Sequence, residues 1–253
     1  MRSEIILRIH RQDGPGAPKY VQTFRLAYRP KLNIISCLQE IARNPVDADG
    51  KRCAPPVWDC SCLEEVCGAC TMLVNGRPRQ SCSTLVDELP EGTIDLAPLT
   101  KFPVVRDLMV DRQAMFEALK KVKGWVPVDG THDVGPGPRR DPAEAQLAYV
   151  MSRCMTCGCC MEACPNFDGH DMTKFIGPAP IGQTFYFGLH PTGALNQRER
   201  LDALMGKGGI SACGNAQNCV EACPKEIPLT DAITNVNRAV NKRWLLGFLG
   251  AAK

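Results

Sequence analysis

The chain has 253 residues, of which 44% are apolar, which is enough for two modest hydrophobic cores and often means two domains. Its formal net charge is only +3 and its basic residues are scattered, so it lacks the basic stripe typical of nucleic-acid-binding proteins and no nucleic-acid partner is expected. No apolar run approaches the ~20 residues that a membrane-spanning helix needs.

Cysteine is unusually frequent, with fifteen copies. Residues 1–11 hold only a few apolar residues, interrupted by Arg8, so we predict no secretory signal sequence and expect thiols of a reducing compartment rather than disulfides. Five of the cysteines fall within residues 154–164. In a chain without a predicted secretory signal, five cysteines so close together indicate a cofactor site.

The chain opens with two strand-like runs, residues 4–9 and 20–26, joined by a turn-rich stretch at residues 12–16, which predicts a β-hairpin. An amphipathic helix follows, with Asn33 as its cap and Pro45 just beyond its end. Its apolar face consists of Ile34, Ile35, Leu38 and Ile41. Two strands, a helix and then a cysteine loop are the plan of a β-grasp domain.

The cysteine loop has the plant-type [2Fe–2S] spacing, C-x4-C-x2-C, followed by one distant cysteine after a hairpin turned by Asn75 and Gly76. The predicted [2Fe–2S] ligands are Cys62, Cys67, Cys70 and Cys82. Gly68 lets the backbone approach the inorganic sulfurs and direct N–H groups at them, which helps to set the reduction potential.

Four cysteines stand outside every cluster motif: Cys37, Cys53, Cys60 and Cys159. We expect them to act as small buried apolar residues rather than ligands, because free cysteine is among the most buried residue types.

Residues 93–106, which include Pro98 and Pro103, lead out of the first domain. Asp111 then caps a predicted helix that ends at Gly124. Its apolar face consists of Met115, Phe116, Leu119 and Val122. Residues 127–142, rich in proline and glycine, predict an ordered surface connection. We therefore predict two domains, residues 1–106 and 107–253.

The stretch from Cys154 to Pro165 carries the C-x2-C-x2-C-x3-C-P spacing of bacterial ferredoxins, in which three thiolates bind one cluster and the fourth binds another. A second copy of the motif begins at Cys213, with Ala216 where its second cysteine would stand. Exchanging the fourth ligands between the motifs predicts two sites. A [4Fe–4S] site has the ligands Cys154, Cys157, Cys160 and Cys223, and a [3Fe–4S] site has Cys164, Cys213 and Cys219.

Zinc is the alternative occupant, since C-x2-C pairs also hold tetrahedral Zn²⁺. Zinc motifs rarely carry a terminal Cys-Pro twice, as this chain does at Pro165 and Pro224, so clusters are favoured. Helices at residues 196–205, ended by Gly206, and 230–244 frame the two motifs and predict an all-α second domain.

The apolar tail, residues 244–252, is too short to cross a bilayer. Contact with a membrane subunit or lipid headgroups, and packing on its own domain or a partner, both remain open. The four histidines, His10, His132, His170 and His190, are widely spaced and none forms a Rieske-type pair, so no catalytic residue is predicted.

The three motifs together resemble those of the iron–sulfur subunits of succinate dehydrogenase and fumarate reductase, over nearly the whole chain. Several stretches resemble the menaquinone-reducing bacterial branch of that family: residues 63–70, 154–158, 177–180, 190–193 and 219–225. The resemblance implies an α+β fold, with an N-terminal β-grasp [2Fe–2S] ferredoxin domain before an all-α bacterial-ferredoxin-like domain that holds two clusters.

The resemblance also implies partners and a location. A flavoprotein with covalent FAD would oxidise succinate to fumarate, and this chain would pass the electrons to a cytochrome b subunit with haem b that reduces menaquinone. The chain would lie peripherally on the cytoplasmic side of the cell membrane, held there by the other subunits. The alternatives are fumarate reduction by the same path in reverse, a free-standing multi-cluster carrier, and a non-redox metal-stabilised binding module.

The sequence departs from the mitochondrial branch of the family. Leu63 and Glu65 stand where that branch has arginine and glycine, Asp168 and Gly169 where a tryptophan pair contacts ubiquinone, and Gly214 where it has a histidine. By analogy, we expect the membrane subunit to provide most of the quinone site.

Overall fold

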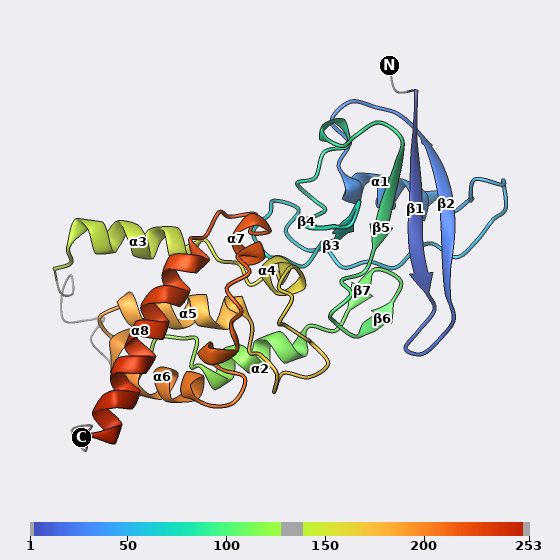
Figure 1. Ribbon diagram of the computed structural model, residues 1–253. Helices are drawn as coiled ribbons and strands as arrows, with labels where there is room; N and C mark the ends of the chain where they lie inside the picture. The colour runs from blue at the N-terminus through green and yellow to red at the C-terminus, as the bar shows by residue number, and fades with distance from the viewer. Residues whose placement is uncertain (1–2, 128–138, 250–253) are drawn as a thin grey trace. The chain divides into compact units, whose positions relative to one another are not determined.

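A computed structural model describes residues 3–127 and 139–249 of the chain, and Figure 1 names its helices and strands. Most of the predicted surface connection at residues 127–142 lies outside the described residues. The last three residues of the apolar tail, 250–252, lie outside them as well.

The chain divides into two compact units. Unit 1 comprises Met1–Arg112 together with Met155–Glu162, and unit 2 comprises Gln113–Cys154 and Ala163–Lys253. A short piece of the first ferredoxin-like motif therefore belongs to the N-terminal unit, which its position in the sequence does not suggest. The predicted domain ranges 1–106 and 107–253 stay a prediction.

Unit 1 is built on a five-stranded mixed sheet with the strand order β2-β1-β5-β3-β4. The strands are β1 (Glu4–Gln12), β2 (Lys19–Ala27), β3 (Thr71–Val74), β4 (Arg77–Gln80) and β5 (Thr93–Ala97). β1 pairs antiparallel with β2 and parallel with β5, while β3 runs antiparallel to β4 and β5. Both predicted hairpins are confirmed, and the sheet with its helix α1 is the predicted β-grasp.

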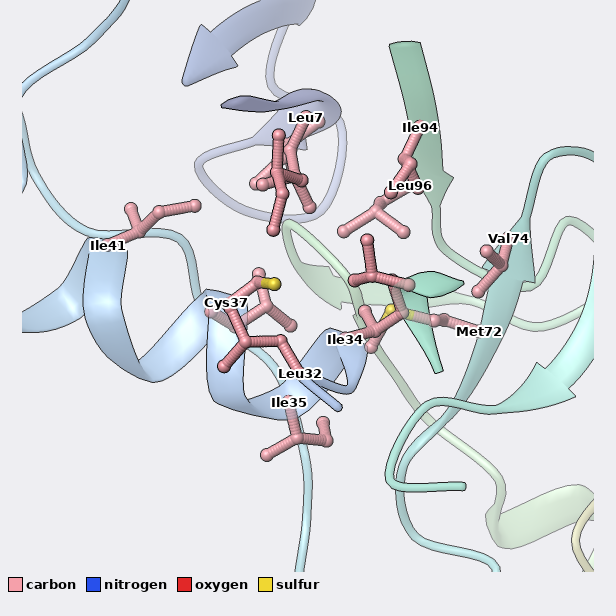
Figure 2. Packing of buried hydrophobic residues seen from close by; sticks show 14 of the residues in the cluster. Leu7, Leu32, Ile34, Ile35, Cys37, Ile41, Met72, Val74, Ile94 and Leu96 are labelled. Atoms are coloured by element: carbon pink, nitrogen blue, oxygen red, sulfur yellow. The ribbon is translucent and has the colours of Figure 1, made fainter. Parts of the chain in front are cut away.

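Helix α1 (Ile34–Arg43) begins where it was predicted to begin. The Asn33 side chain accepts a hydrogen bond from the Ser36 N–H at 2.8 Å, which satisfies one of the free donors of the first turn. The buried face of α1 packs with Leu7 of β1 and Leu96 of β5 in the core of unit 1 (Figure 2). Cys37 is completely buried in this core, so its predicted role as an apolar core residue is confirmed.

A buried ion pair ties the long segment before the cysteine loop to the sheet. The Arg11 guanidinium donates to the Asp107 carboxylate at 3.0 Å and to the Ala54 carbonyl oxygen at 2.8 Å. The same carboxylate accepts from the Val57 N–H at 2.9 Å. Asp107 lies between the short strands β6 (Val104–Arg106) and β7 (Met109–Val110). Satisfied buried charges of this kind specify one arrangement of the chain, because breaking the pair leaves an unpaired charge.

Unit 2 is helical, as predicted, in the residues that the structure describes. Its α-helices are α2 (Gln113–Lys121), α3 (Pro142–Ser152), α5 (Pro178–Leu189), α6 (Gln197–Met205), α7 (Asn218–Glu221) and α8 (Leu229–Phe248), and its 3₁₀ turns are η3 (Gly193–Asn196) and η4 (Ile210–Ala212). The 3₁₀ turn η1 (Val86–Glu88) and helix α4 (Cys159–Glu162) belong to unit 1. The predicted helices at residues 196–205 and 230–244 correspond to α6 and α8.

Helix α5 is the centre of unit 2. It packs against α2, α3, α6 and α8, and its first seven residues are all buried, so it lacks the polar face of a surface helix. Gly182 admits the Leu229 side chain, because a Cβ atom there would lie 2.8 Å from Leu229 Cδ2. The buried Arg200 guanidinium joins α6 to the segment after α2 by donating to the Lys123 and Trp125 carbonyl oxygens.

The last residues of α8, from Trp244 on, are apolar and exposed. Trp244, Phe248 and Leu249 expose 63%, 78% and 65% of their surface, and the rings of Trp244 and Phe248 stack at 5.9 Å. These side chains are mostly exposed in the part of the chain that the structure describes. No helix among the described residues has the length and apolarity that crossing a membrane requires.

Candidate functional site

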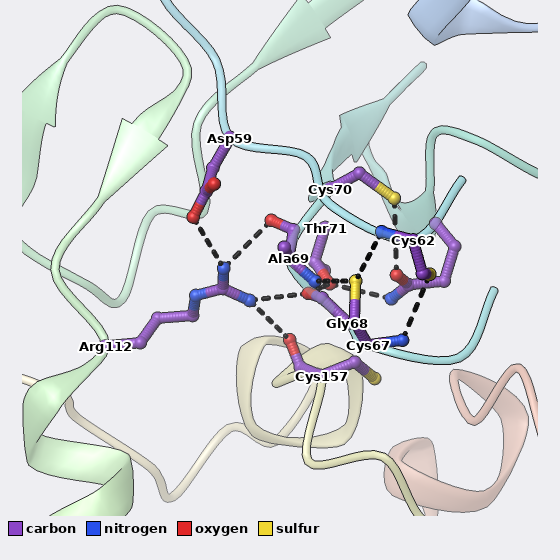
Figure 3. Close-up of polar contacts among 10 residues, drawn as sticks. Asp59, Cys62, Cys67, Gly68, Ala69, Cys70, Thr71, Arg112 and Cys157 are labelled. Atoms are coloured by element: carbon purple, nitrogen blue, oxygen red, sulfur yellow. Dashed lines mark hydrogen bonds and ion pairs between the residues drawn. The ribbon is translucent and has the colours of Figure 1, made fainter. Parts of the chain in front are cut away.

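The predicted [2Fe–2S] loop in unit 1 curls its backbone N–H groups around sulfur (Figure 3). The N–H groups of Glu64, Val66 and Cys67 donate to Cys62 Sγ at 3.4, 3.3 and 3.3 Å, and Figure 3 shows the bond from Cys67. Left-handed backbone makes this possible, with φ of +61° at Leu63, +55° at Glu65 and +72° at Gly68. N–H···S bonds stabilise thiolate, the form of cysteine that binds metal.

The four thiols of this loop fall into two pairs. The Cys62 N–H donates to Cys67 Sγ at 3.5 Å, and the Cys67 N–H donates back to Cys62 Sγ. Cys70 and Cys82 lie beside each other, both buried. A cluster with two irons and four cysteine ligands requires two pairs of thiolates, so this arrangement fits a [2Fe–2S] cluster.

One thiol of each pair, Cys62 and Cys70, has a pKa far from its usual value, and the two shifts have opposite directions. Hydrogen bonds from the N–H groups of Glu64 and then Val66 lower the pKa of the Cys62 thiol to about 6. Burial raises the pKa of the Cys70 thiol to about 12. The Cys62 thiol is therefore ready as thiolate near neutral pH, whereas iron has to displace a proton from the Cys70 thiol.

Residues 155–162 are anchored in unit 1 next to the [2Fe–2S] loop. The Glu162 carboxylate accepts from the Thr100 N–H at 2.9 Å and from the Lys101 N–H at 3.1 Å. Gly68 touches Cys157: a Cβ atom at Gly68 would lie 2.7 Å from Cys157 Cα. The close approach to Cys157 is a second reason for a glycine at position 68, in addition to the one predicted from the sequence.

Three residues that the sequence analysis did not single out link the cysteine segments of unit 1. Glu162 is the first. Arg112 is the second, and donates to the carbonyl oxygens of Gly68 and Ala69 (Figure 3). The third is the buried Gln80, which donates to Thr71 Oγ1 at 2.7 Å. Glu162 stands inside the first ferredoxin-like motif and Gln80 two residues before Cys82, but the motif spacing singles out cysteines alone, so the sequence provides no signal that would have identified these three residues.

Cysteines outside the predicted ligand sets occupy different surroundings. Cys159 is completely buried, and its Sγ accepts from the Gln80 amide at 3.7 Å. A hydrogen bond with the Cys157 thiol and burial together raise the pKa of Cys159, while the same bond lowers the pKa of Cys157 to about 7. Cys53 and Cys60 are partly buried against the core of unit 1.

Unit 2 contains a pocket of about 360 Å³, part of it open to solvent, between the two ferredoxin-like motifs. The three cysteines predicted to bind a [3Fe–4S] cluster all line it: Cys164, Cys213 and Cys219. Burial raises the pKa of Cys219, and the neighbouring thiols Cys164 and Cys213 raise it further. Ala216 is also in the wall. The pocket thus has three thiols and a methyl group where the template expects a fourth thiol.

Polar side chains hold the two motifs together around this pocket. Asn166 donates to the Ala212 carbonyl oxygen at 2.9 Å, and Asn218 donates to the Ala163 carbonyl oxygen at 3.2 Å. The chain around Ala216 is tightly turned, with left-handed φ at Asn215 (+53°) and Gln217 (+64°). The donor set, soft thiols without an oxygen ligand among them, suits iron–sulfur chemistry.

The remaining predicted set draws on both units. Cys157 and Cys160 belong to unit 1, whereas Cys154 and Cys223 belong to unit 2. Cys223 Sγ accepts from the Ile227 N–H at 3.4 Å, another N–H···S bond of the kind found around Cys62. The assignment of these four cysteines to one [4Fe–4S] cluster stays a prediction.

Comparison with known proteins identifies the family. A model described as a 2Fe-2S iron-sulfur cluster binding domain matches residues 6–117, and one described as a 4Fe-4S dicluster domain matches residues 149–227. The succinate dehydrogenase iron-sulfur subunit of Bacillus subtilis is 55% identical over 96% of this chain and 95% of its own length. The chain belongs to the family of succinate dehydrogenase and fumarate reductase iron–sulfur subunits.

Other members of this family agree with the assignment. The fumarate reductase iron-sulfur subunit of Wolinella succinogenes is 28% identical over 92% of this chain and 96% of its own length. A chain of the Mycobacterium smegmatis Sdh1 complex in the apo form has a TM-score of 0.78, at 22% identity, over 96% of this chain and 98% of that chain. The last similarity supports the fold.

Family membership confirms the predicted fold class, a [2Fe–2S] ferredoxin domain followed by a helical two-cluster domain. It also confirms the predicted cofactors, a [2Fe–2S], a [4Fe–4S] and a [3Fe–4S] cluster, over the zinc alternative. The chain is an electron-transfer subunit of a succinate:quinone oxidoreductase rather than a complete enzyme.

Proposed function

We propose that this chain conducts electrons between a flavoprotein subunit that holds covalent FAD and a membrane-anchoring cytochrome b subunit that holds haem b and reduces menaquinone. Succinate oxidation to fumarate releases two electrons and two protons at the flavin. Each cluster supplies one-electron redox chemistry, so the electrons travel singly and reduce menaquinone with two protons to menaquinol. The same residues serve fumarate reduction when electrons move in the opposite direction.

The proposed ligands are those that the motif spacing predicts. Cys62, Cys67, Cys70 and Cys82 hold the [2Fe–2S] cluster; Cys154, Cys157, Cys160 and Cys223 hold the [4Fe–4S] cluster; Cys164, Cys213 and Cys219 hold the [3Fe–4S] cluster. The observation that carries the proposal is the pocket of unit 2, in which three thiols and Ala216 face one space. The role of this chain's residues is to bind the clusters, to exclude water from them and to tune their potentials.

We further propose that the membrane subunit supplies most of the quinone contacts. Gly214 and Asp168 replace the larger side chains that the mitochondrial branch places near ubiquinone, and Gly214 has no side chain to contribute. The exposed Trp244 and Phe248 at the end of α8 supply apolar area for a membrane-bound partner or lipid headgroups. Under this proposal, the chain lies peripherally, on the cytoplasmic side of the cell membrane.

Purification from the native membrane tests the proposed partners. A tag on this chain should retain, after mild detergent, a protein with covalently bound flavin and a protein with the absorbance of haem b, because the chain contributes cluster sites alone. A chain cut off from both should keep no succinate–quinone activity. Recovery of a fully active enzyme that consists of this chain by itself would contradict the proposal.

Ala216→Cys tests the assignment of the third cluster. The substitution completes the C-x2-C-x2-C-x3-C-P template and adds a thiol to the pocket wall, so a second [4Fe–4S] cluster should assemble. The added thiolate and the changed cluster type should lower the reduction potential, and succinate–quinone turnover should fall. Electron paramagnetic resonance (EPR) of the oxidised complex should lose the near-isotropic [3Fe–4S] signal while iron content rises.

Ala212→Cys is the matched control, because Ala212 is next to Cys213 but does not line the pocket. This variant should keep the oxidised [3Fe–4S] signal and the wild-type iron content. A wild-type complex that lacks the signal, or an Ala216→Cys complex that retains it in full, would show that the ligand assignment is wrong.

A further inference from the structure

The [2Fe–2S] loop and residues 155–162 meet at one close backbone contact within unit 1. A Cβ atom at Gly68 would lie 2.7 Å from Cys157 Cα and 2.8 Å from Cys157 Cβ. Under the proposed function, Gly68 follows a [2Fe–2S] ligand directly and Cys157 is a [4Fe–4S] ligand. The backbones that carry ligands of two different clusters therefore touch here.

The Arg112 guanidinium lies beside this contact and bonds to residues on both sides of it (Figure 3). Its Nη1 donates to the Gly68 carbonyl oxygen at 2.6 Å and reaches the Cys157 carbonyl oxygen at 3.5 Å. Its Nη2 donates to the Ala69 carbonyl oxygen at 2.8 Å. The planar fork of the guanidinium thus holds two peptides of the [2Fe–2S] loop and faces one peptide of the other segment.

The charge of Arg112 is only partly neutralised. Its side chain is 13% exposed, and its ion-pair partner Asp59, at 3.3 Å, is 45% exposed. Water screens the carboxylate more than the guanidinium, and an arginine stays protonated at every physiological pH. A largely buried positive charge therefore lies beside peptides that flank Cys67, Cys70 and Cys157.

We propose that Arg112 is the positioning residue of this junction: it locks the Gly68–Cys157 contact and raises the reduction potentials of the [2Fe–2S] and [4Fe–4S] clusters together. The proposal rests on the proposed function. One electron moves from the reduced [2Fe–2S] cluster to the oxidised [4Fe–4S] cluster, and no bond or proton moves with it. Each reduction adds a negative charge, which a nearby guanidinium stabilises. A single charge near both clusters raises both potentials, so it changes the difference between them by less than it changes either one.

Four variants of the intact complex test this proposal, with potentials measured by redox titration monitored by EPR. Arg112→Met removes the charge at similar length, whereas Arg112→Lys keeps the charge and loses the fork. Asp59→Asn removes the partner's charge and leaves Arg112 in place. Arg77→Met, on the exposed β3–β4 turn side of the sheet, removes a surface charge without a contact to the cysteine loop and is the matched control.

Arg112→Met should shift the one-electron reduction equilibrium of the [2Fe–2S] cluster on the order of tenfold towards the oxidised form, which corresponds to about 59 mV. The [4Fe–4S] cluster should shift in the same direction and the [3Fe–4S] cluster should not, since no contact of Arg112 reaches its ligands among the described residues. Arg112→Lys should keep most of the wild-type potential. Asp59→Asn should raise the [2Fe–2S] potential, by less than Arg112→Met lowers it. Arg77→Met should have the wild-type potentials.

The proposal would be overturned if Arg112→Met had the same reduction potentials as Arg77→Met. It would also be overturned if the [2Fe–2S] potential of Arg112→Lys were as low as that of Arg112→Met. Should Arg112→Met fail to assemble, Asp59→Asn decides: a raised [2Fe–2S] potential supports the proposal, and an unchanged or lowered one overturns it. The proposed function has a separate readout, because it fails if the wild-type complex lacks the three EPR signals or the partner subunits, whatever the variants do.

Discussion

Cys67→Ala is expected to remove the [2Fe–2S] cluster and to uncouple succinate oxidation from quinone reduction. Cys67 is exposed, so its replacement costs little packing, but the loop then offers three thiolates to a cluster that takes four. Loss of a residue that only orients a metal ligand typically costs 10–100-fold in affinity or activity, so loss of a ligand should lower turnover by on the order of a hundredfold or more.

The readouts are the reduced [2Fe–2S] EPR signal, the iron and sulfide content, and succinate–quinone turnover. Cys53→Ala is the matched control, because Cys53 is partly buried near the same loop and its Sγ contacts the Pro45 carbonyl oxygen rather than another cysteine. This variant should keep the EPR signal and most of the turnover. Equal losses in the two variants would contradict the ligand assignment of Cys67.

Gly68→Ala is expected to be the most damaging conservative change in unit 1. A Cβ atom at Gly68 would lie 2.7 Å from Cys157 Cα, and a backbone atom cannot move aside as the end of a flexible side chain can. The left-handed φ of +72° costs an alanine roughly 1–2 kcal/mol, and overpacking costs about 1–3 kcal/mol more. We expect a lower thermal midpoint, partial loss of [2Fe–2S] content and a perturbed [4Fe–4S] EPR signal.

Gly76→Ala separates the two costs. Gly76 has a similar φ of +75°, but nothing lies within 4 Å of the Cβ atom that alanine would add. This variant should therefore show the backbone cost alone, with both EPR signals unchanged. If Gly76→Ala and Gly68→Ala lower the thermal midpoint equally and leave the clusters alike, the contact between Gly68 and Cys157 is not tight in the assembled protein.

Local patterns in the sequence determined the secondary structure and the cofactors of this protein. The β-hairpin at residues 4–26, the Asn33 cap and the helices α6 and α8 are encoded by neighbouring residues, because turn chemistry, caps and apolar periodicity act over a few positions. Cluster types follow from cysteine spacing for a similar reason: a cluster a few ångströms across collects its ligands mostly from one short loop.

The gap at Ala216 is visible in the sequence, since a missing cysteine in a repeated template can be recognised without a structure. The structure adds that Ala216 shares one pocket with the three thiols, which is a statement about distant segments. From the sequence, Cys164 can be grouped with Cys213 and Cys219 only by analogy with ferredoxins that have two paired motifs.

Only the tertiary structure decided which segments of the chain lie together. Residues 155–162 belong to unit 1, where the Glu162 carboxylate accepts a hydrogen bond from the Thr100 N–H and Cys157 contacts Gly68. Nothing in the sequence distinguishes Arg112 from the other arginines. Its contacts with three carbonyl oxygens, seen only in the folded chain, make it a candidate for tuning the reduction potentials of two clusters. Contacts between residues separated by some forty to ninety positions depend on the packing of the whole unit, and no local propensity or periodicity encodes them.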